Sequence, residues 1–195
     1  MNRSNDTVMY ISPAAADVDF SPVERELLER VNQRIAAGRT LGEVLDFLFD
    51  TTREICPCDR IGVAFADDRG ERLTAYWTRA LYGPLKLDKG YAEDVGRSSL
   101  KRVMDEGQIR VIGDLELYLR AHPGSHSTRL LVEEGVRSNL TCPLTVDGRS
   151  VGVLFRSARR PNAYTEGHLR WHAAIVERLS QAVEKVYRIE QLIGC

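Results

Sequence analysis

Apolar residues spaced three and four positions apart predict two helices early in the chain and one long helix at its end. At residues 21–24 the sequence Ser-Pro-Val-Glu combines a capping box with proline at the first helical position. Gly38 is expected to end this helix, and a second capping box at residues 40–43 opens the next one. The last helix is predicted from Thr165 to about Leu192. Helices are therefore expected at both ends of the fold.

Segments in which apolar and polar residues alternate predict β-strands between these helices. The runs 61–66 and 72–78 flank a loop rich in turn formers and are expected to form a hairpin. Asp147-Gly148 separates the runs 139–146 and 149–157, and Asp-Gly between two strands is a strong signal for a type I′ turn. The other predicted elements are a strand at 108–112 and short helices at 98–106, 115–119 and 128–134.

The first part of the chain, residues 1–20, follows neither period and is predicted to be a mobile arm. Residues 21–192 are then expected to form one domain. A chain of 195 residues can bury enough apolar surface to fold without disulfides or a metal. The order of elements predicts a mixed α/β fold.

The charge balance argues against a nucleic-acid partner, because 27 Lys and Arg residues face 28 Asp and Glu residues and no basic stripe stands out. No apolar run approaches the roughly 20 residues that span a bilayer, and the start of the chain lacks the pattern of a secretion signal. The four cysteines are too few and too unevenly placed for a secreted disulfide scaffold. We expect a cytoplasmic protein without membrane insertion.

The Asp147-Gly148 turn predicts which side chains share a face of the sheet. If these two residues alone form the turn, one apolar face results, and it should meet the long helices. The opposite face then carries small and polar residues, which leave room for a ligand. The predicted apolar pairs are Cys142 with Val153, Leu140 with Phe155 and Leu144 with Val151, and the opposite face carries Asn139, Thr141, Gly152 and Leu154, with Gly62, Ala64, Ala75, Trp77 and Arg60 from the first hairpin.

Two helices, a hairpin, a crossover, a second hairpin and a long closing helix resemble the GAF domain of bacterial and plant signalling proteins. The resemblance is sharpest over residues 41–65 and 136–164, with the segments Ser-Asn-Leu-Thr-Cys-Pro-Leu and Val-Gly-Val-Leu. It implies a six-stranded antiparallel sheet with long helices on one face and a ligand pocket under short helices and loops on the other. It also implies a downstream signalling output, such as a histidine kinase or a cyclase. Since no output motif is present, we expect either a fragment of a larger protein or a stand-alone sensor.

Three GAF subclasses have residue patterns that this sequence does not match. The Asn-Lys-Phe-Asp-Glu set of cyclic-nucleotide binders is missing, and none of Cys56, Cys58 and Cys142 lies in the setting of a bilin attachment site. The cysteine pattern of the free methionine sulfoxide reductases is also unmatched. The identity of the ligand or cofactor therefore stays open.

A ligand cavity and a filled sheet face are both compatible with the small residues, because glycine in a strand can simply allow close packing. The resemblance adds Tyr118, Arg129 and Ser138 as neighbours of a pocket. The candidate ligand-binding residues are Gly62, Ala64, Ala75, Trp77, Tyr118, Arg129, Ser138, Thr141 and Gly152.

No arrangement of residues predicts catalysis or a metal site. His168 and His172 have helical spacing, but no third ligand is evident. Cys56 and Cys58 flank a proline where a helix ends, which favours structural thiols over a redox pair. No nucleophile with a base, no carboxylate pair and no phosphate loop is found. We expect a protein that is not an enzyme.

Three functions fit these observations. A small-molecule sensor that relays its state through the terminal helices is preferred, with a ligand-free dimerisation or docking module as the alternative. A redox sensor or enzyme using Cys56 and Cys58 is a minority hypothesis. The narrow apolar seam of the last helix predicts a parallel homodimer. The expected interface residues are Leu28, Val31, Val176, Leu179, Val183 and Val186.

Overall fold

A seven-stranded antiparallel sheet forms the centre of the computed structural model, which describes residues 8–12, 19–37, 40–96 and 98–193. The side chains of residues 181 and 184–193 are not part of this description. Along the sheet the strands follow the order β1-β5-β6-β7-β2-β3-β4. The strands are β1 (Val8–Ile11), β2 (Arg60–Ala66), β3 (Arg72–Ala80), β4 (Ala92–Asp94), β5 (Ile109–Ile112), β6 (Ser138–Val146) and β7 (Arg149–Ala158).

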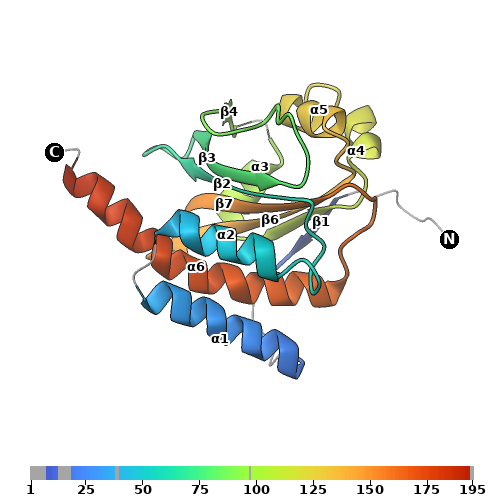
Figure 1. Ribbon diagram of the computed structural model, residues 1–195. Coiled ribbons are helices and arrows are strands. Elements are labelled where there is room, and N and C mark those ends of the chain that lie inside the picture. Colours follow the sequence, from blue (N-terminus) through green and yellow to red (C-terminus); the bar gives the residue numbers. More distant parts are fainter. Residues whose placement is uncertain (1–7, 13–18, 38–39, 97, 194–195) are drawn as a thin grey trace.

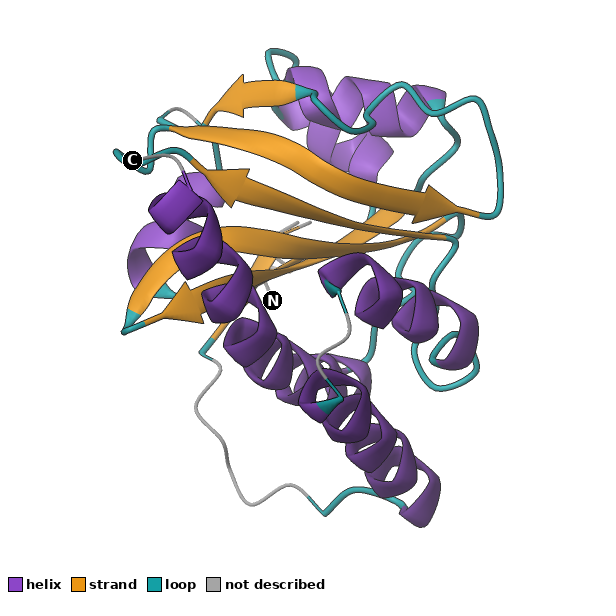
Figure 2. Cartoon of the chain, turned by 60° about the vertical axis from the view of Figure 1, so that its left-hand side comes forward, coloured by secondary structure: helices purple, strands orange, loops and turns teal. Residues whose placement is uncertain are grey.

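Helices cover both faces of the sheet (Figure 1). Three long helices lie on one face, and three short helices lie on the other beside the strand β4. Figure 2 shows the same layers from a view turned by 60°. The predicted mixed α/β architecture is confirmed. The first face carries α1 (Pro22–Ala36), α2 (Leu41–Thr51) and α6 (Glu166–Ile193), and the second carries α3 (Leu100–Glu106), α4 (Leu115–Ala121) and α5 (His126–Glu133).

Both predicted capping boxes are present. The amide of Glu24 donates to Oγ of Ser21 at 3.3 Å, and the amide of Ser21 donates to Oε2 of Glu24 at 2.7 Å. Thr40 and Glu43 make the same pair of bonds at 3.3 and 3.0 Å. Each box satisfies two backbone donors that a helix start leaves free, which fixes where α1 and α2 begin.

The strand β1 lies inside the segment that the sequence predicts to be a mobile arm. It pairs with β5, with Met9 opposite Val111. The hydroxyl of Tyr10 donates to the carbonyl of Ser99 at 3.3 Å, and the guanidinium of Arg102 lies over its ring. The prediction of a mobile arm is therefore wrong for Val8–Ile11. Four residues are too few to show the alternation of a strand, and this strand is stabilised mainly by its pairing with β5.

A β-bulge between Leu144 and Thr145 corrects the predicted register of the second hairpin. Cys142 lies opposite Leu154, and Leu144 lies opposite Gly152, so that Val151 has no partner on β6. One extra residue on β7 turns every later side chain of that strand to the other face. Leu154 consequently joins the core beneath α6, while Phe155 reaches the opposite face.

The apolar seam of α6 is buried inside the chain itself. Leu179 is completely buried, and Val176 and Val183 are 4% and 1% exposed. Leu28 and Val31 of α1 belong to the same core. All five residues lie in the core that the long helices form with the sheet, so their assignment to a dimer interface is wrong. The side chain of Val186 lies outside the described residues, and homodimerisation itself stays a prediction.

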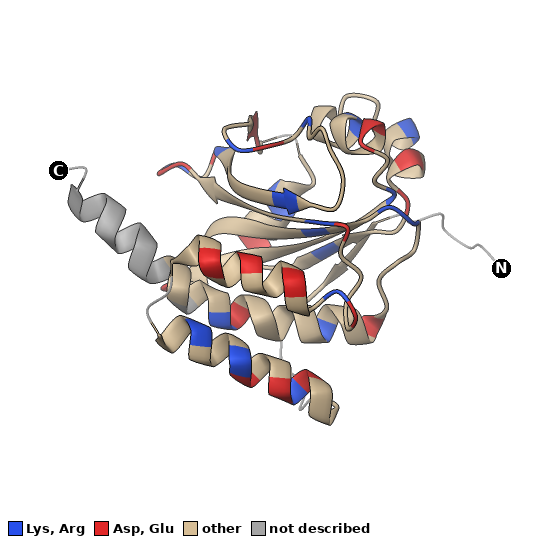
Figure 3. Cartoon of the chain, viewed as in Figure 1, with Lys and Arg blue, Asp and Glu red and all other residues tan. Residues whose placement is uncertain are grey.

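Charged side chains of both signs are spread over the surface. Figure 3 shows acidic residues along α2 and a mixture of both signs on α1. Arg79 of β3 donates to the carboxylates of Asp46 and Asp50 at 2.7 and 2.8 Å and so ties α2 to the sheet. Exposed ion pairs contribute little to the free energy of folding, so the main effect of these two pairs is to orient α2 on the sheet.

We predict that Leu179→Ala lowers the free energy of unfolding by about 2–5 kcal/mol, because it leaves a cavity in the core beneath the sheet. The matched control is Leu117→Ala on α4, where the side chain is 42% exposed. Urea unfolding measures both variants. Equal stability of the two variants would contradict the placement of the α6 seam in the core.

A second matched pair tests the register. At Gly152 a Cβ atom would overlap the backbone carbonyl of Ala64, whereas at Gly62 it would meet Thr78 and Trp77 at an ordinary 3.4 Å. Gly152→Ala should therefore cost about 1–3 kcal/mol, as overpacking does, and Gly62→Ala should be tolerated. Thermal unfolding compares the two. The opposite order would mean that the bulge is misplaced.

Candidate ligand pocket

A cavity of about 70 Å³ lies between the sheet and the short helices. One water molecule needs about 10–15 Å³ of such space, so the cavity can hold several waters or a small molecule. Strands β2, β3, β5, β6 and β7 form its floor, and α3, α5 and the loop around β4 form its roof. It lies on the sheet face opposite α6, where the sequence predicts a pocket.

The floor is made of small and apolar side chains. Gly62 and Ala64 on β2 and Ala75 on β3 lie beside Phe155 and Leu73. A Cβ atom on Gly62 would already touch its neighbours, so glycine adds depth at this point. Short side chains here leave the space that larger residues would fill.

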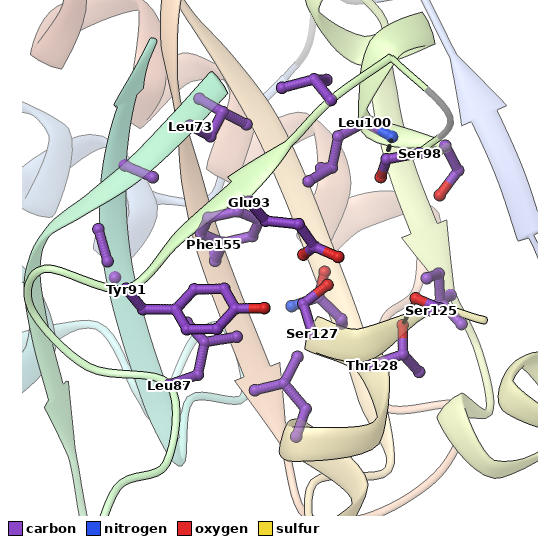
Figure 4. Close-up of a pocket in the computed structure, with 18 of the residues that line it drawn as sticks. Leu73, Leu87, Tyr91, Glu93, Ser98, Leu100, Ser125, Ser127, Thr128 and Phe155 are labelled. Carbon is purple, nitrogen blue, oxygen red and sulfur yellow. Dashed lines mark hydrogen bonds between the residues drawn. The ribbon is translucent and has the colours of Figure 1, made fainter. Parts of the chain in front are cut away.

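The roof is lined by hydroxyl groups. Figure 4 shows Ser98 beside Leu100 and, from α5 and the residue before it, Ser125, Ser127 and Thr128. The hydroxyl of Ser125 donates to Thr128 at 2.7 Å. An apolar floor and a few convergent polar groups are typical of small-molecule sites.

Tyr91 and Glu93 extend into the cavity from the segment around β4 (Figure 4). The ring of Tyr91 stacks on His126 of α5, with the ring centroids 6.2 Å apart. Burial and the nearby Glu93 carboxylate raise the pKa of Tyr91 to about 12, so its hydroxyl stays protonated at neutral pH. It can therefore donate a hydrogen bond as well as accept one.

A buried ion pair holds one end of the pocket together. Nε of Arg60 lies 3.6 Å from Oε2 of Glu134, and the two side chains are 2% and 0% exposed. The amides of Lys86 and Leu87 donate to Oε1 of Glu134 at 2.6 and 2.9 Å, and the Tyr82 hydroxyl donates to Oε2 at 3.0 Å. The pair joins β2 to the end of α5 and to the loop that follows β3.

Arg110 lines the cavity from the middle of β5 and is 7% exposed. Its Nη1 donates to Oγ of Ser99 at 2.6 Å and its Nη2 donates to Oγ1 of Thr141 at 3.0 Å. No carboxylate of the described residues lies within ion-pair distance of it. Burial lowers the pKa of Arg110.

A family model for the GAF domain matches residues 38–184, which is more than half of the chain. The chain belongs to the GAF domain family. The resemblance inferred from its sequence is thereby confirmed.

Several solved GAF structures share this fold at low sequence identity. The GAF domain of a phosphoenolpyruvate-protein phosphotransferase from Coxiella burnetii has a TM-score of 0.70 at 18% identity, covering 88% of this chain and 99% of that one. A free methionine-R-sulfoxide reductase from Neisseria meningitidis, solved in complex with its substrate, has a TM-score of 0.64 at 17% identity, covering 91% and 99%. The GAF domain of a two-component sensor histidine kinase from Bacillus halodurans has a TM-score of 0.64 at 18% identity, covering 80% and 99%. No curated protein sequence matches this chain.

The structure of this GAF domain brings three of the candidate residues into the cavity wall, namely Gly62, Ala64 and Ala75. Tyr118 and Thr141 lie directly behind it, because Ser99 and Arg110 are their hydrogen-bond partners. Neither is itself part of the wall.

Four other candidate residues lie away from the cavity. A bulge at Tyr76 turns Trp77 toward the long helices, and the bulge on β7 removes Gly152 from the cavity face. Arg129 is exposed and donates to the carbonyl of Pro123, and Ser138 donates to the carbonyl of Arg160 at 2.9 Å. The positions of these four follow from the bulges and from local hydrogen bonds, which the strand pattern does not show.

Sequence reasoning missed Arg110, Glu93 and Glu134 as residues of this site. The one available signal is that Arg110 interrupts the otherwise apolar strand Ile-Arg-Val-Ile. A charged residue in the middle of a buried strand needs a partner or a function.

Cys56, Cys58 and Cys142 lie on the other face of the sheet. Burial raises the pKa of the Cys56 thiol to about 11 and also raises the pKa values of Cys58 and Cys142, although Arg156 acts in the opposite direction on all three. Thiols in this state are poor nucleophiles. Arg156 itself donates to the carbonyl of Cys56 at 3.1 Å and to Oγ1 of Thr52 at 2.9 Å.

The two helical histidines have different surroundings. His168 accepts a hydrogen bond from the amide of Thr165 at 3.1 Å, while His172 is completely buried, which lowers its pKa well below the usual range. Within the described residues, no three side chains of His, Cys, Asp or Glu are grouped to hold a metal ion. None of the described helices is both long and apolar enough to cross a membrane.

We predict that Glu134→Gln destabilises the GAF domain by about 3–5 kcal/mol, because it leaves the buried Arg60 without a counter-charge. The control is Glu133→Gln, the adjacent residue, which makes an exposed ion pair with Lys86 and should change little. Urea unfolding of both variants checks this. Similar stability of the two would show that Arg60 does not depend on Glu134.

Proposed function

We propose that this GAF domain is a non-catalytic sensor that binds a small molecule in the cavity between the sheet and α3–α5. The proposal also holds that the bound state is relayed through the terminal helices α1 and α6 to a downstream signalling output. The cavity itself carries the proposal, since it combines an enclosed apolar floor with convergent hydroxyl, carboxylate and guanidinium groups.

The sheet offers a short path from the cavity to the helices. On β6, Thr141 lies behind the cavity wall and accepts a hydrogen bond from Arg110, while its neighbours Leu140 and Cys142 belong to the core under α6. A shift of β6 by a ligand therefore acts directly on the packing of α6. Such a shift requires that the ligand bind one arrangement of the two layers more tightly than the other.

A regulatory role is supported by the relatives and by the position of the thiols. GAF neighbours include a domain of a sensor histidine kinase, which is the kind of output that we propose here. The methionine sulfoxide reductase neighbour shows that the fold can also host an enzyme. In this chain Cys56, Cys58 and Cys142 are buried on the sheet face away from the cavity, which argues against thiol chemistry on a ligand there.

Filling the cavity tests the proposal. Ala64→Leu should keep the melting temperature near that of the wild type, because the added carbons enter open space. The variant should lose stabilisation by ligands found in a thermal-shift screen of metabolites. For the wild type that stabilisation is about 2.7 kcal/mol at a ligand concentration one hundred times the Kd. The matched control is Ala121→Leu at the exposed end of α4, and this variant should still be stabilised by the ligand.

Two results would contradict the sensor. A large fall in the melting temperature of Ala64→Leu, with no metabolite stabilising the wild type, would mean that this face is filled, as in a ligand-free docking module. Hydrogen exchange measures the relay separately. If a ligand binds but the hydrogen exchange of the α6 amides does not change, the proposed relay is contradicted while ligand binding is not.

A further inference from the structure

The charges in the cavity wall do not all belong to ion pairs. Four charged residues line the cavity, and two of them belong to ion pairs that the protein completes itself. Arg60 is paired with Glu134 at 3.6 Å, and Asp94 is paired with Arg72 at 3.2 Å. Arg110 and Glu93 are left, and neither has an ion-pair partner among the described residues.

The partners of Arg110 are neutral hydroxyls, and its Nε has no hydrogen-bond partner. Burying a guanidinium is costly unless an anion compensates its charge. Three of its five N–H groups remain after the bonds to Ser99 and Thr141. The planar arrangement of these donors matches a carboxylate.

The two hydroxyls do not need Arg110 to be satisfied. Oγ of Ser99 is also 2.9 Å from the Tyr118 hydroxyl, and Thr141 donates to Oδ1 of Asn139 at 2.7 Å. Asn139 in turn donates to Ser157 at 2.9 Å. The network around Arg110 therefore positions the guanidinium, and its charge is available to a ligand.

Glu93 supplies the opposite charge. Figure 4 shows its carboxylate extending into the cavity from β4 toward Ser127, with the hydroxyl of Tyr91 nearby. A carboxylate surrounded by hydroxyl groups is suited to bind an ammonium group, which carries three donors. The Tyr91 hydroxyl donates to this carboxylate, and Glu93 acts on Arg110 without lying within ion-pair distance of it. The cavity thus has one cationic and one anionic group, and neither is in an ion pair among the described residues.

The sum of these charges selects the ligand class. A simple anion would be attracted by Arg110 but repelled by Glu93, and a simple cation would meet the reverse. We propose that the ligand is a small zwitterion, an α-amino acid with an apolar side chain, whose carboxylate binds Arg110 and whose ammonium binds Glu93. This inference rests on the proposed sensor function.

The floor and the volume determine the side chain. Ala64, Leu73 and Phe155 offer apolar contacts, and the space of about 70 Å³ suits a molecule with few heavy atoms. Glycine, alanine, valine and leucine are therefore the probes. For valine, isovalerate lacks the ammonium and isobutylamine lacks the carboxylate, so the three compounds separate the two charges.

Isothermal titration of the wild-type chain with these probes is the test. At least one amino acid should bind, and for valine we expect isovalerate and isobutylamine to bind at least tenfold more weakly. Arg110→Met should abolish amino-acid binding, and Glu93→Gln should weaken it at least tenfold. The matched controls are Arg120→Met on α4 and Glu106→Gln on α3, both at exposed positions, and they should bind like the wild type.

A second readout separates a ligand group from a structural one. Because Ser99 and Thr141 keep other partners, Arg110→Met should unfold at or above the wild-type temperature without ligand. If Arg110→Met unfolds well below the wild type, or binds an amino acid as tightly, the inference is overturned.

The ligand screen distinguishes this inference from the sensor function. A metabolite that stabilises the wild type, loses its effect in Ala64→Leu and lacks either charge would overturn the zwitterion and leave the sensor intact. Equal binding of valine and isovalerate would do the same. If no compound of the screen or the panel binds, both the sensor and the zwitterion are overturned.

Discussion

The cavity and the helix core of this GAF domain both depend on the alternation of side chains along β6 and β7. Because successive residues of a strand point to opposite faces, one strand supplies both the cavity and the core beneath α6. Thr141 contacts Arg110 on the cavity face, and Cys142 next to it is buried among the long helices. The cavity and the helix core therefore lie on opposite sides of one sheet. Repacking either of them affects strands that also form the other.

Three guanidinium groups in the sheet are nearly or fully buried, and their different partners explain their different roles. Arg60 has the carboxylate of Glu134 and joins elements together. Arg156 faces the helices and is held by a carbonyl and the Thr52 hydroxyl at the end of α2. Arg110 faces the cavity and has only hydroxyls. Glu93 acts on Arg110 without reaching ion-pair distance. A buried cation without a close anion is costly, so its presence beside an open cavity favours a ligand that places a negative charge against the guanidinium.

The sequence was sufficient for the elements that carry strong local signals. Both capping boxes, the Asp147-Gly148 hairpin and the long last helix are where their residues predict them. The small residues Gly62, Ala64 and Ala75 do lie at the cavity. The strand β1 could not be found, because its stability comes from pairing with a segment about one hundred residues away.

Two of the errors in the predicted site, at Gly152 and Trp77, have the same physical origin. A single extra residue at Val151 exchanges the faces of β7, and another at Tyr76 does the same for Trp77, while no turn signal marks either position. The apolar seam of α6 was misread for a related reason, since a narrow stripe fits a second helix and a sheet face equally well. Arg110 and Glu93 come together from β5 and β4 only through the order of strands and the loop over the cavity, which single-chain periodicity does not contain.

The position of Arg110 also supports the proposed relay to the helices. An anion on the N–H groups that Ser99 and Thr141 leave free would lie on the same guanidinium, and Thr141 is linked to Asn139 and through it to Ser157 of β7. Neutralising the charge therefore alters the forces on β5, β6 and β7 together. The helix α6 packs on the reverse side of β6, with Leu179 and Val183 in the shared core. If the proposed ligand changes the spacing of these strands, it changes the surface on which α6 rests, which requires that the ligand bind one arrangement of the strands more tightly than the other.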